Sequence, residues 1–170
     1  MSRVGKYYAA ALKHAGISFD MLFGPAYKGI PLVVATAIAY ADDHGTDVPF
    51  AFNRKEAKHH GEGGMLVGAE LKGKVIIVDD VITAGTAIRE VLDLLAETPA
   101  SVAGALVAID RQERGHHDKS AIQEIEAEFG IPVVSVVNLG HIVSYLEQTG
   151  RFQQELVQMQ AYRDKYGVTP

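Results

Sequence analysis

Residues 75–87 of the chain read VIIVDDVITAGTA, and this segment decides the fold. The four β-branched residues at its start are typical of a buried strand in a parallel sheet. Asp79 and Asp80 follow at the expected carboxyl end of that strand. A short turn of small and hydroxyl-bearing residues comes next, and the apolar spacing of residues 84–97 indicates a helix. The segment therefore predicts a strand, a polar turn and a helix in immediate succession.

The turn at residues 83–87 suits a phosphate group, because a helix N-terminus presents free N–H groups and a positive dipole end. Its two threonines can add hydroxyl donors, and the alanine and glycine between them let a ligand approach the backbone. Asp79 and Asp80 could accept hydrogen bonds from a sugar diol, or hold Mg²⁺ directly or through water. A simple helix cap is the alternative, but it needs one residue and leaves the rest of the segment unexplained.

The same alternation of strand and helix continues along the chain. Strands are expected at residues 19–23, 48–53, 75–78, 102–109 and 133–137, and helices at residues 3–15, 29–43, 84–97, 119–129, 140–148 and 152–166. This order predicts one α/β domain over residues 1–170, with a mainly parallel five-stranded sheet flanked by helices. The first helix places Tyr8 on its apolar face, and residues 54–70 are too polar for the core. Ligands of such sheets bind beyond the carboxyl ends of the strands, so the loops at 24–29, 54–64, 79–86 and 110–118 are the candidate site.

Composition limits the possible partners and the cellular compartment. The chain has 170 residues, a net charge of −5 and no cysteine. A mildly acidic chain has no general attraction to nucleic acid or to an anionic membrane, so neither is expected as a partner. The lack of cysteine excludes a disulfide scaffold and a thiol nucleophile. No signal core or membrane-spanning run is evident, so a cytoplasmic location is expected.

Three further loops carry cations. Residues 23–31 read FGPAYKGIP and place Lys28 at a helix start, where the dipole disfavours a cation unless an anion lies nearby. Residues 53–64 read NRKEAKHHGEGG, a composition expected to be mobile when empty and able to close over a polyanion. Residues 108–115 read AIDRQERG, in which Arg111 can bind a planar carboxylate with two hydrogen bonds. Taken alone, each loop also fits an ordinary surface segment, with Arg111 in an ion pair with Glu113.

Together these segments resemble the type I phosphoribosyltransferases, and their loops match those of the orotate-using members of that family. The resemblance covers residues 7–167. It implies the type I phosphoribosyltransferase fold and a reaction between orotate and 5-phosphoribosyl 1-diphosphate (PRPP). The products would be orotidine 5′-phosphate and diphosphate, as in de novo pyrimidine biosynthesis. The family usually carries several tens of residues before this point, which build part of a hood over the base. An incomplete hood, and a chain that binds PRPP better than orotate and turns over slowly, are therefore expected.

The resemblance also implies roles for individual residues. Catalytic roles are implied for Lys28, Arg54, Lys58 and His60. PRPP binding is implied for Tyr27, Lys28, Arg54, Lys55, Lys58, His60, Asp79, Asp80, Val81, Ile82, Thr83, Ala84, Gly85, Thr86 and Ala87, and orotate binding for Thr83 and Arg111. Mg²⁺ is the expected cofactor, carried by PRPP either without direct protein ligands or through Asp79 and Asp80. The paired histidines at 59–60 and 116–117 are interpreted as solvated loop residues, because a structural metal site needs more ligands.

The resemblance further implies a homodimer in which the loop at residues 54–64 reaches the neighbouring active site, with Lys55 serving that site as well. Two other functions stay open. Transfer to a purine or another base is compatible with the turn at residues 83–87, although the basic loop argues against it. A non-catalytic PRPP-binding regulator is the other, although a regulator would not need cations for a leaving group.

Overall fold

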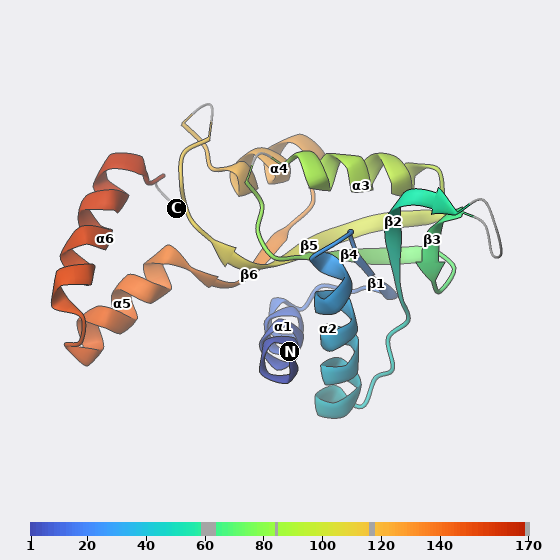
Figure 1. The fold of residues 1–170 in the computed structure, drawn as a ribbon, viewed down its shortest axis with the longest axis horizontal. Helices are drawn as coiled ribbons and strands as arrows, with labels where there is room; N and C mark the ends of the chain where they lie inside the picture. Colours follow the sequence, from blue (N-terminus) through green and yellow to red (C-terminus); the bar gives the residue numbers. More distant parts are fainter. Residues whose placement is uncertain (59–63, 84, 116–117, 169–170) are drawn as a thin grey trace.

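The computed structural model describes residues 1–58, 64–83, 85–115 and 118–168, which form a twisted sheet covered by helices on both faces (Figure 1). The strands are β1 (Met21–Gly24), β2 (Phe50–Lys58), β3 (Gly64–Gly68), β4 (Gly73–Asp79), β5 (Ala100–Asp110) and β6 (Val133–Asn138). The helices are α1 (Ser2–Ala15), α2 (Gly29–His44), α3 (Thr86–Ala96), α4 (Ala121–Phe129), α5 (Leu139–Thr149) and α6 (Gln153–Tyr166). Within the described residues the strand order is β3-β2-β1-β4-β5-β6. Every neighbouring pair is parallel except β2 and β3, so the α/β prediction is confirmed.

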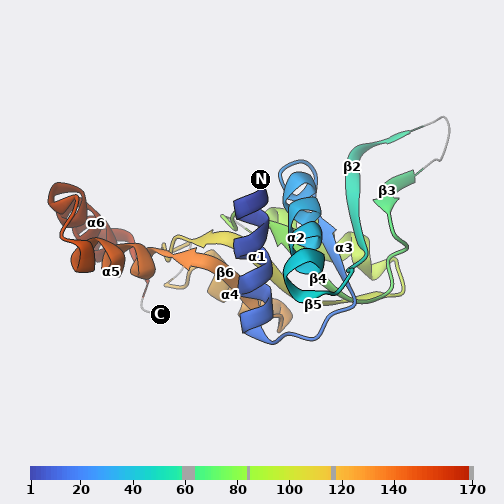
Figure 2. The same ribbon diagram turned by 90° about the horizontal axis from the view of Figure 1, so that it is seen from below.

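The core lies on both faces of the sheet, because successive side chains of a strand point to opposite sides. Ile76 and Val78 of β4 pack with α1 and α2 on one face. Val75 and Ile77 pack with α3 and α4 on the other face. Figures 1 and 2 show this arrangement, with α1 and α2 on one side of the sheet and α3 and α4 on the other. A strand that is buried on both faces explains why residues 75–78 are continuously apolar.

Helices α5 and α6 lie beyond β6, outside the two helical layers (Figure 1). They share a small core of their own, formed by Val143, Leu146 and Leu156. The end of α6 returns to the loop that follows β5. There the Arg114 N–H donates to the Tyr166 carbonyl at 2.8 Å, and the Val168 N–H donates to the Gln112 carbonyl at 2.9 Å. The last helix therefore supports a loop that sequence analysis placed in the candidate site.

The edge hairpin differs from the prediction. Residues 54–64 were expected to form a loop and no strand was expected within residues 54–70, but β2 continues to Lys58 and β3 occupies Gly64–Gly68, so the described sheet has six strands rather than five. The two strands pair in antiparallel fashion, with a register shift between Asn53 and Lys58. Residues 54–58 that extend β2 are polar, and the apolar run of β3, residues 65–67, is too short to indicate a strand on its own.

Most other boundaries agree with the prediction to within a few residues. Helix α1 ends at Gly16, which has a left-handed φ of 66°, as expected for a helix-stopping glycine. Helix α3 begins at Thr86 rather than at residue 84, so more of the preceding turn is non-helical. None of the helices in the described part of the chain has the length and hydropathy needed to cross a bilayer.

Candidate active site

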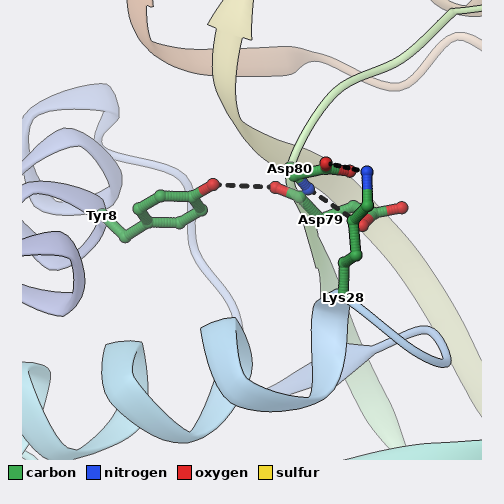
Figure 3. Close-up of polar contacts among 4 residues, drawn as sticks. All are labelled: Tyr8, Lys28, Asp79 and Asp80. Carbon is green, nitrogen blue, oxygen red and sulfur yellow. Dashed lines mark hydrogen bonds and ion pairs between the residues drawn. The ribbon is translucent and has the colours of Figure 1, made fainter. Parts of the chain in front are cut away.

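The loops that follow β1 and β4 meet at the carboxyl edge of the sheet. These two strands are parallel neighbours, so their ends lie side by side although they are about fifty residues apart in sequence. Lys28, at the end of the first loop, places its Nζ 2.6 Å from Oδ2 of Asp80 (Figure 3). The ion pair is exposed on the lysine side, where the Lys28 side chain is 74% accessible. The structure thus brings the predicted diphosphate turn and the acidic pair into direct contact.

The backbone of the acidic pair is held from both sides. The Tyr8 hydroxyl, on the buried face of α1, donates to the Asp79 carbonyl oxygen at 2.9 Å (Figure 3). The Ala108 N–H of β5 donates to the Asp80 carbonyl at 2.9 Å. The Asp80 N–H donates to Oδ1 of Asp79 at 2.9 Å. Tyr8 was absent from the predicted site, because a tyrosine on the apolar face of a helix has the same pattern as a core residue.

The electrostatics of the site follow from this packing. Burial raises the pKa of Asp79 to about 6; the N–H donated by Asp80 opposes that shift, while the negative charge of the Asp80 carboxylate adds to it. The hydrogen bond to Asp80 raises the pKa of Lys28. Burial, followed by the charges of Asp80 and Asp79, raises the pKa of the Tyr8 phenol well above its ordinary value. Asp79 is therefore a carboxylate that a cation or a hydroxyl donor would stabilise in its charged form.

The turn between β4 and α3 lines a cavity of about 280 Å³. Its lining residues are Asp79, Val81, Ile82, Thr83, Gly85, Thr86, Ala87, Ile88 and Glu90. Helix α3 has Gly85 as its N-cap, with a φ of 71° and no side-chain cap. Since no side chain caps them, the first N–H groups of α3 can serve an anion in this cavity. Ala84, which was predicted to belong to this cradle, lies outside the described residues.

The turn between β1 and α2 contains the other predicted phosphate contacts. The Ala26 N–H donates to Oδ1 of Asn53 in β2 at 2.8 Å, and the Ala26–Tyr27 peptide is cis. Tyr27 is 67% accessible as a residue, and Nζ of Lys55 lies 5.5 Å from the centroid of its ring. Strand β2 thus brings Lys55 to the Tyr27–Lys28 turn of the same chain. Strand β2 ends at Lys58, and the side chain of Lys58 is outside the described part of the structure. His60 is not among the described residues.

The predicted orotate contacts also converge. Thr83 and Arg111 line one cleft of about 100 Å³, between the turn after β4 and the loop after β5. Other lining residues are Ile82, Asp110, Gln112, Glu113, Arg114, Gly115, Ser120, Ala121 and Ile122. Nη2 of Arg111 lies 2.6 Å from Oε1 of Glu113, so the surface ion pair considered as an alternative is present as well. The hydrogen bond to Glu113 raises the pKa of Arg111.

Comparison with known proteins defines the class. The chain matches the family model for the phosphoribosyl transferase domain over residues 2–137 and belongs to that family. It is 57% identical to the orotate phosphoribosyltransferase of Pseudoalteromonas translucida over 168 residues, which cover 99% of this chain and 78% of that protein. It is 58% identical to the enzyme of the same name in Pseudomonas fluorescens, over 99% of this chain and 79% of that protein. The crystal structure of orotate phosphoribosyltransferase from Francisella tularensis superposes with a TM-score of 0.87 at 39% identity, over 98% of this chain and 79% of that one.

The chain accordingly belongs to the orotate phosphoribosyltransferases, the transferases that place a phosphoribosyl group on orotate in pyrimidine biosynthesis. The fold and the class of enzyme that the sequence predicted are confirmed.

Proposed function

We propose that this chain carries out phosphoribosyl transfer from PRPP to a ring nitrogen of orotate at the edge formed by the loops after β1, β4 and β5. The observation that carries the proposal is the 2.6 Å contact between Lys28 and Asp80. This contact places the cationic turn at Lys28, which suits a diphosphate, beside the acidic pair Asp79 and Asp80, which suits a ribose diol. The C1–O bond to be broken would lie between these two groups.

In this proposal the 5′-phosphate occupies the cavity at residues 81–87, and Asp79 and Asp80 accept hydrogen bonds from the ribose hydroxyls. The diphosphate contacts Tyr27, Lys28, Arg54 and Lys55, together with Lys58 and His60. Orotate lies in the cleft lined by Thr83 and Arg111. The remaining members of the phosphate cradle are Val81, Ile82, Ala84, Gly85, Thr86 and Ala87.

Catalysis would come from positioning and from stabilising the charge of the leaving group. The ring nitrogen forms a bond to C1 of the ribose and releases its proton to solvent, while the C1–O bond to the diphosphate breaks, through a state that resembles an oxocarbenium ion. Lys28 and Arg54 supply positive charge to the departing oxygens, and Lys58 or His60 supplies a proton. No covalent intermediate with the protein is needed.

The residues present fit a magnesium ion. Asp79 and Asp80 provide the hard oxygen ligands that Mg²⁺ prefers, and among the described residues Lys28 is the cation that pairs with Asp80. Burial raises the pKa of Asp79, so a cation nearby would stabilise the charged form of this carboxylate. When bound together with PRPP, Mg²⁺ would neutralise charge on the diphosphate. Asp79 and Asp80 would hold it directly or through water.

We also propose a homodimer in which the loop at residues 54–64 reaches the neighbouring site. The support is the position of β2 and β3 at the open edge of the sheet, where the hairpin extends away from the helical layers (Figure 2). A cytoplasmic location is proposed as well, because a chain without cysteine suits a reducing compartment.

The test is formation of orotidine 5′-phosphate and diphosphate from PRPP, orotate and Mg²⁺. Wild-type protein should form both products, and Asp80→Asn should lower turnover on the order of 100-fold, since charge-assisted contacts at the reacting centre are removed. Glu70→Gln, on the exposed loop between β3 and β4, is a control that should retain activity. Product formed with adenine but not with orotate would support the alternative of another base. Saturable PRPP binding without formation of either product would support the other alternative, a non-catalytic PRPP-binding regulator.

A further inference from the structure

Arg111, the residue proposed to bind the carboxylate of the base, is held by a single oxygen atom of Glu113. Its Nε donates to Oε1 of Glu113 at 2.9 Å, and its Nη2 lies 2.6 Å from the same atom. The Arg111 side chain is 50% accessible, whereas that of Glu113 is 27% accessible. The more buried carboxylate therefore fixes the orientation of the more exposed guanidinium.

The same oxygen has a third partner, which comes from the last helix. The Tyr162 hydroxyl of α6 donates to Oε1 of Glu113 at 2.6 Å. Because this hydrogen bond is made to a charged acceptor, it restrains Glu113 more strongly than a neutral pair would. The end of α6 is itself anchored, since the Tyr166 carbonyl accepts from Arg114 and the Val168 N–H donates to Gln112. Tyr162 thus connects a helix that is anchored at its C-terminal end to Glu113 and, through that carboxylate, to the guanidinium of Arg111.

This arrangement leaves one edge of the guanidinium directed away from Glu113. Arginine has five N–H donors in a planar fork. Glu113 accepts from the edge formed by Nε and Nη2. The other edge, formed by Nη1 and the outer hydrogen of Nη2, can donate two hydrogen bonds to a second carboxylate. Thr83 lines the same cleft, on the side of the phosphate cradle.

We infer that Glu113 and Tyr162 are positioning residues that set Arg111 for recognition of a carboxylate on the base, and that α6 is therefore part of the specificity apparatus. The inference rests on the proposed role of Arg111 in orotate binding. Neither Glu113 nor Tyr162 touches the substrate in this account. Their effect should appear only with a base that carries the carboxylate.

The experiment compares two nucleotides that differ only in that group, namely orotidine 5′-phosphate and uridine 5′-phosphate, by calorimetric titration of the full chain. Arg111→Ala should weaken binding of orotidine 5′-phosphate on the order of 30-fold, and Tyr162→Phe should weaken it about five-fold. Glu113→Gln, which keeps the acceptor but removes its charge, should weaken it by a similar factor of about five. Binding of uridine 5′-phosphate should change less than about two-fold in all three variants, because its base offers Arg111 no charged partner.

Tyr166→Phe is the matched control, because it removes the same atom from the same helix, and the Tyr166 ring lies tilted against that of Tyr162 with ring centroids 4.8 Å apart. It should leave both affinities and the thermal midpoint as in the wild type. A double-mutant cycle adds a readout that a general loss of structure would not give. In the Arg111→Ala background, Tyr162→Phe should have no further effect on orotidine 5′-phosphate.

The outcomes separate the two proposals. If Arg111→Ala left the preference for orotidine 5′-phosphate unchanged, the proposed role of Arg111 would be wrong and the inference would be lost with it. If Arg111→Ala abolished the preference but Tyr162→Phe had no effect, or weakened both nucleotides equally, only the inference would be wrong. Tighter binding of orotidine 5′-phosphate by Glu113→Gln would also overturn it, since Glu113 would then compete with the ligand.

Discussion

At the scale of single residues, the site is defined by what surrounds the acidic pair. Asp79 is partly buried and lies beside the Asp80 carboxylate, which is why its pKa is raised to about 6. The Asp80 carboxylate, in contrast, forms an ion pair with Lys28. The two adjacent aspartates thus differ, since Asp80 already has a cationic partner and Asp79 accepts a backbone hydrogen bond but has no cation in direct contact among the described residues.

The raised pKa of Asp79 predicts a pH dependence of ligand binding. Because the pKa in the folded protein lies above the ordinary value of 3.8, Asp79 is charged above about pH 6 and becomes protonated as the pH falls through that value. The charged form is the better acceptor for a ribose diol, so affinity for ribose 5-phosphate should be full above this range and decline below it. Asp79→Asn should bind more weakly on the order of ten-fold at high pH, and the difference should narrow towards about pH 5.

The measurement is the ratio of the dissociation constants of Asp79→Asn and wild type at each pH. This ratio cancels the titration of the phosphate in the probe. A ratio that stayed constant between about pH 5 and pH 8 would show that Asp79 does not titrate in this range.

At the scale of elements, the strands and helices that could be predicted from the sequence are those with a continuous apolar pattern. Residues 75–78 gave β4 because both faces of that strand are buried, and the helix after them was predicted with an error of two residues at its start. The edge hairpin was missed, because residues 54–58 that extend β2 are polar and the apolar run of β3, residues 65–67, is very short. The link from Arg111 to Tyr162 could not be predicted either. Glu113 and Tyr162 are 49 residues apart in sequence, and the docking of α6 brings them together.

The turn between β1 and α2 should tolerate no side chain at Gly29. A Cβ atom there would lie 2.6 Å from Cδ of Pro25 and 2.8 Å from the Val78 carbonyl oxygen. Gly29→Ala should therefore open the turn, lower the free energy of unfolding by about 2 kcal/mol and weaken diphosphate binding. Denaturant unfolding and titration with diphosphate measure the two effects.

Gly16→Ala is the control for this change. Gly16 has a φ of 66° and nothing within 4 Å of its added Cβ, so alanine there should cost about 1 kcal/mol through backbone strain alone. Diphosphate affinity should remain that of the wild type. Unchanged diphosphate binding by Gly29→Ala would show that the shape of this turn does not matter for the ligand.

At the scale of the whole molecule, the site lies at the carboxyl edge of the sheet, and contributions come from nearly every layer. Helix α1 supplies Tyr8, β2 supplies Lys55, and α6 supplies Tyr162. The hairpin of β2 and β3 projects from the edge of the sheet opposite to α5 and α6 (Figure 2). Such a projection is well placed to meet a second copy of the chain, as the proposed homodimer requires.

Mixing two inactive variants tests that assembly. If the hairpin loop serves the neighbouring site, Asp80→Asn and Lys58→Ala should each be nearly inactive, and a re-equilibrated mixture should recover roughly one quarter of wild-type activity, because half of the dimers contain one intact site. If the loop serves its own subunit, the mixture should stay as inactive as its components. Chemical crosslinking of each sample verifies that subunits have exchanged.

Tyr8 has a consequence for alkaline conditions. An ordinary phenol gives up its proton near pH 10, and a hydroxyl that had done so could no longer donate to the Asp79 carbonyl (Figure 3). Burial and two neighbouring negative charges oppose that ionisation. The same acidic pair that is proposed to bind the sugar therefore also keeps the Tyr8 hydroxyl protonated in alkaline solution.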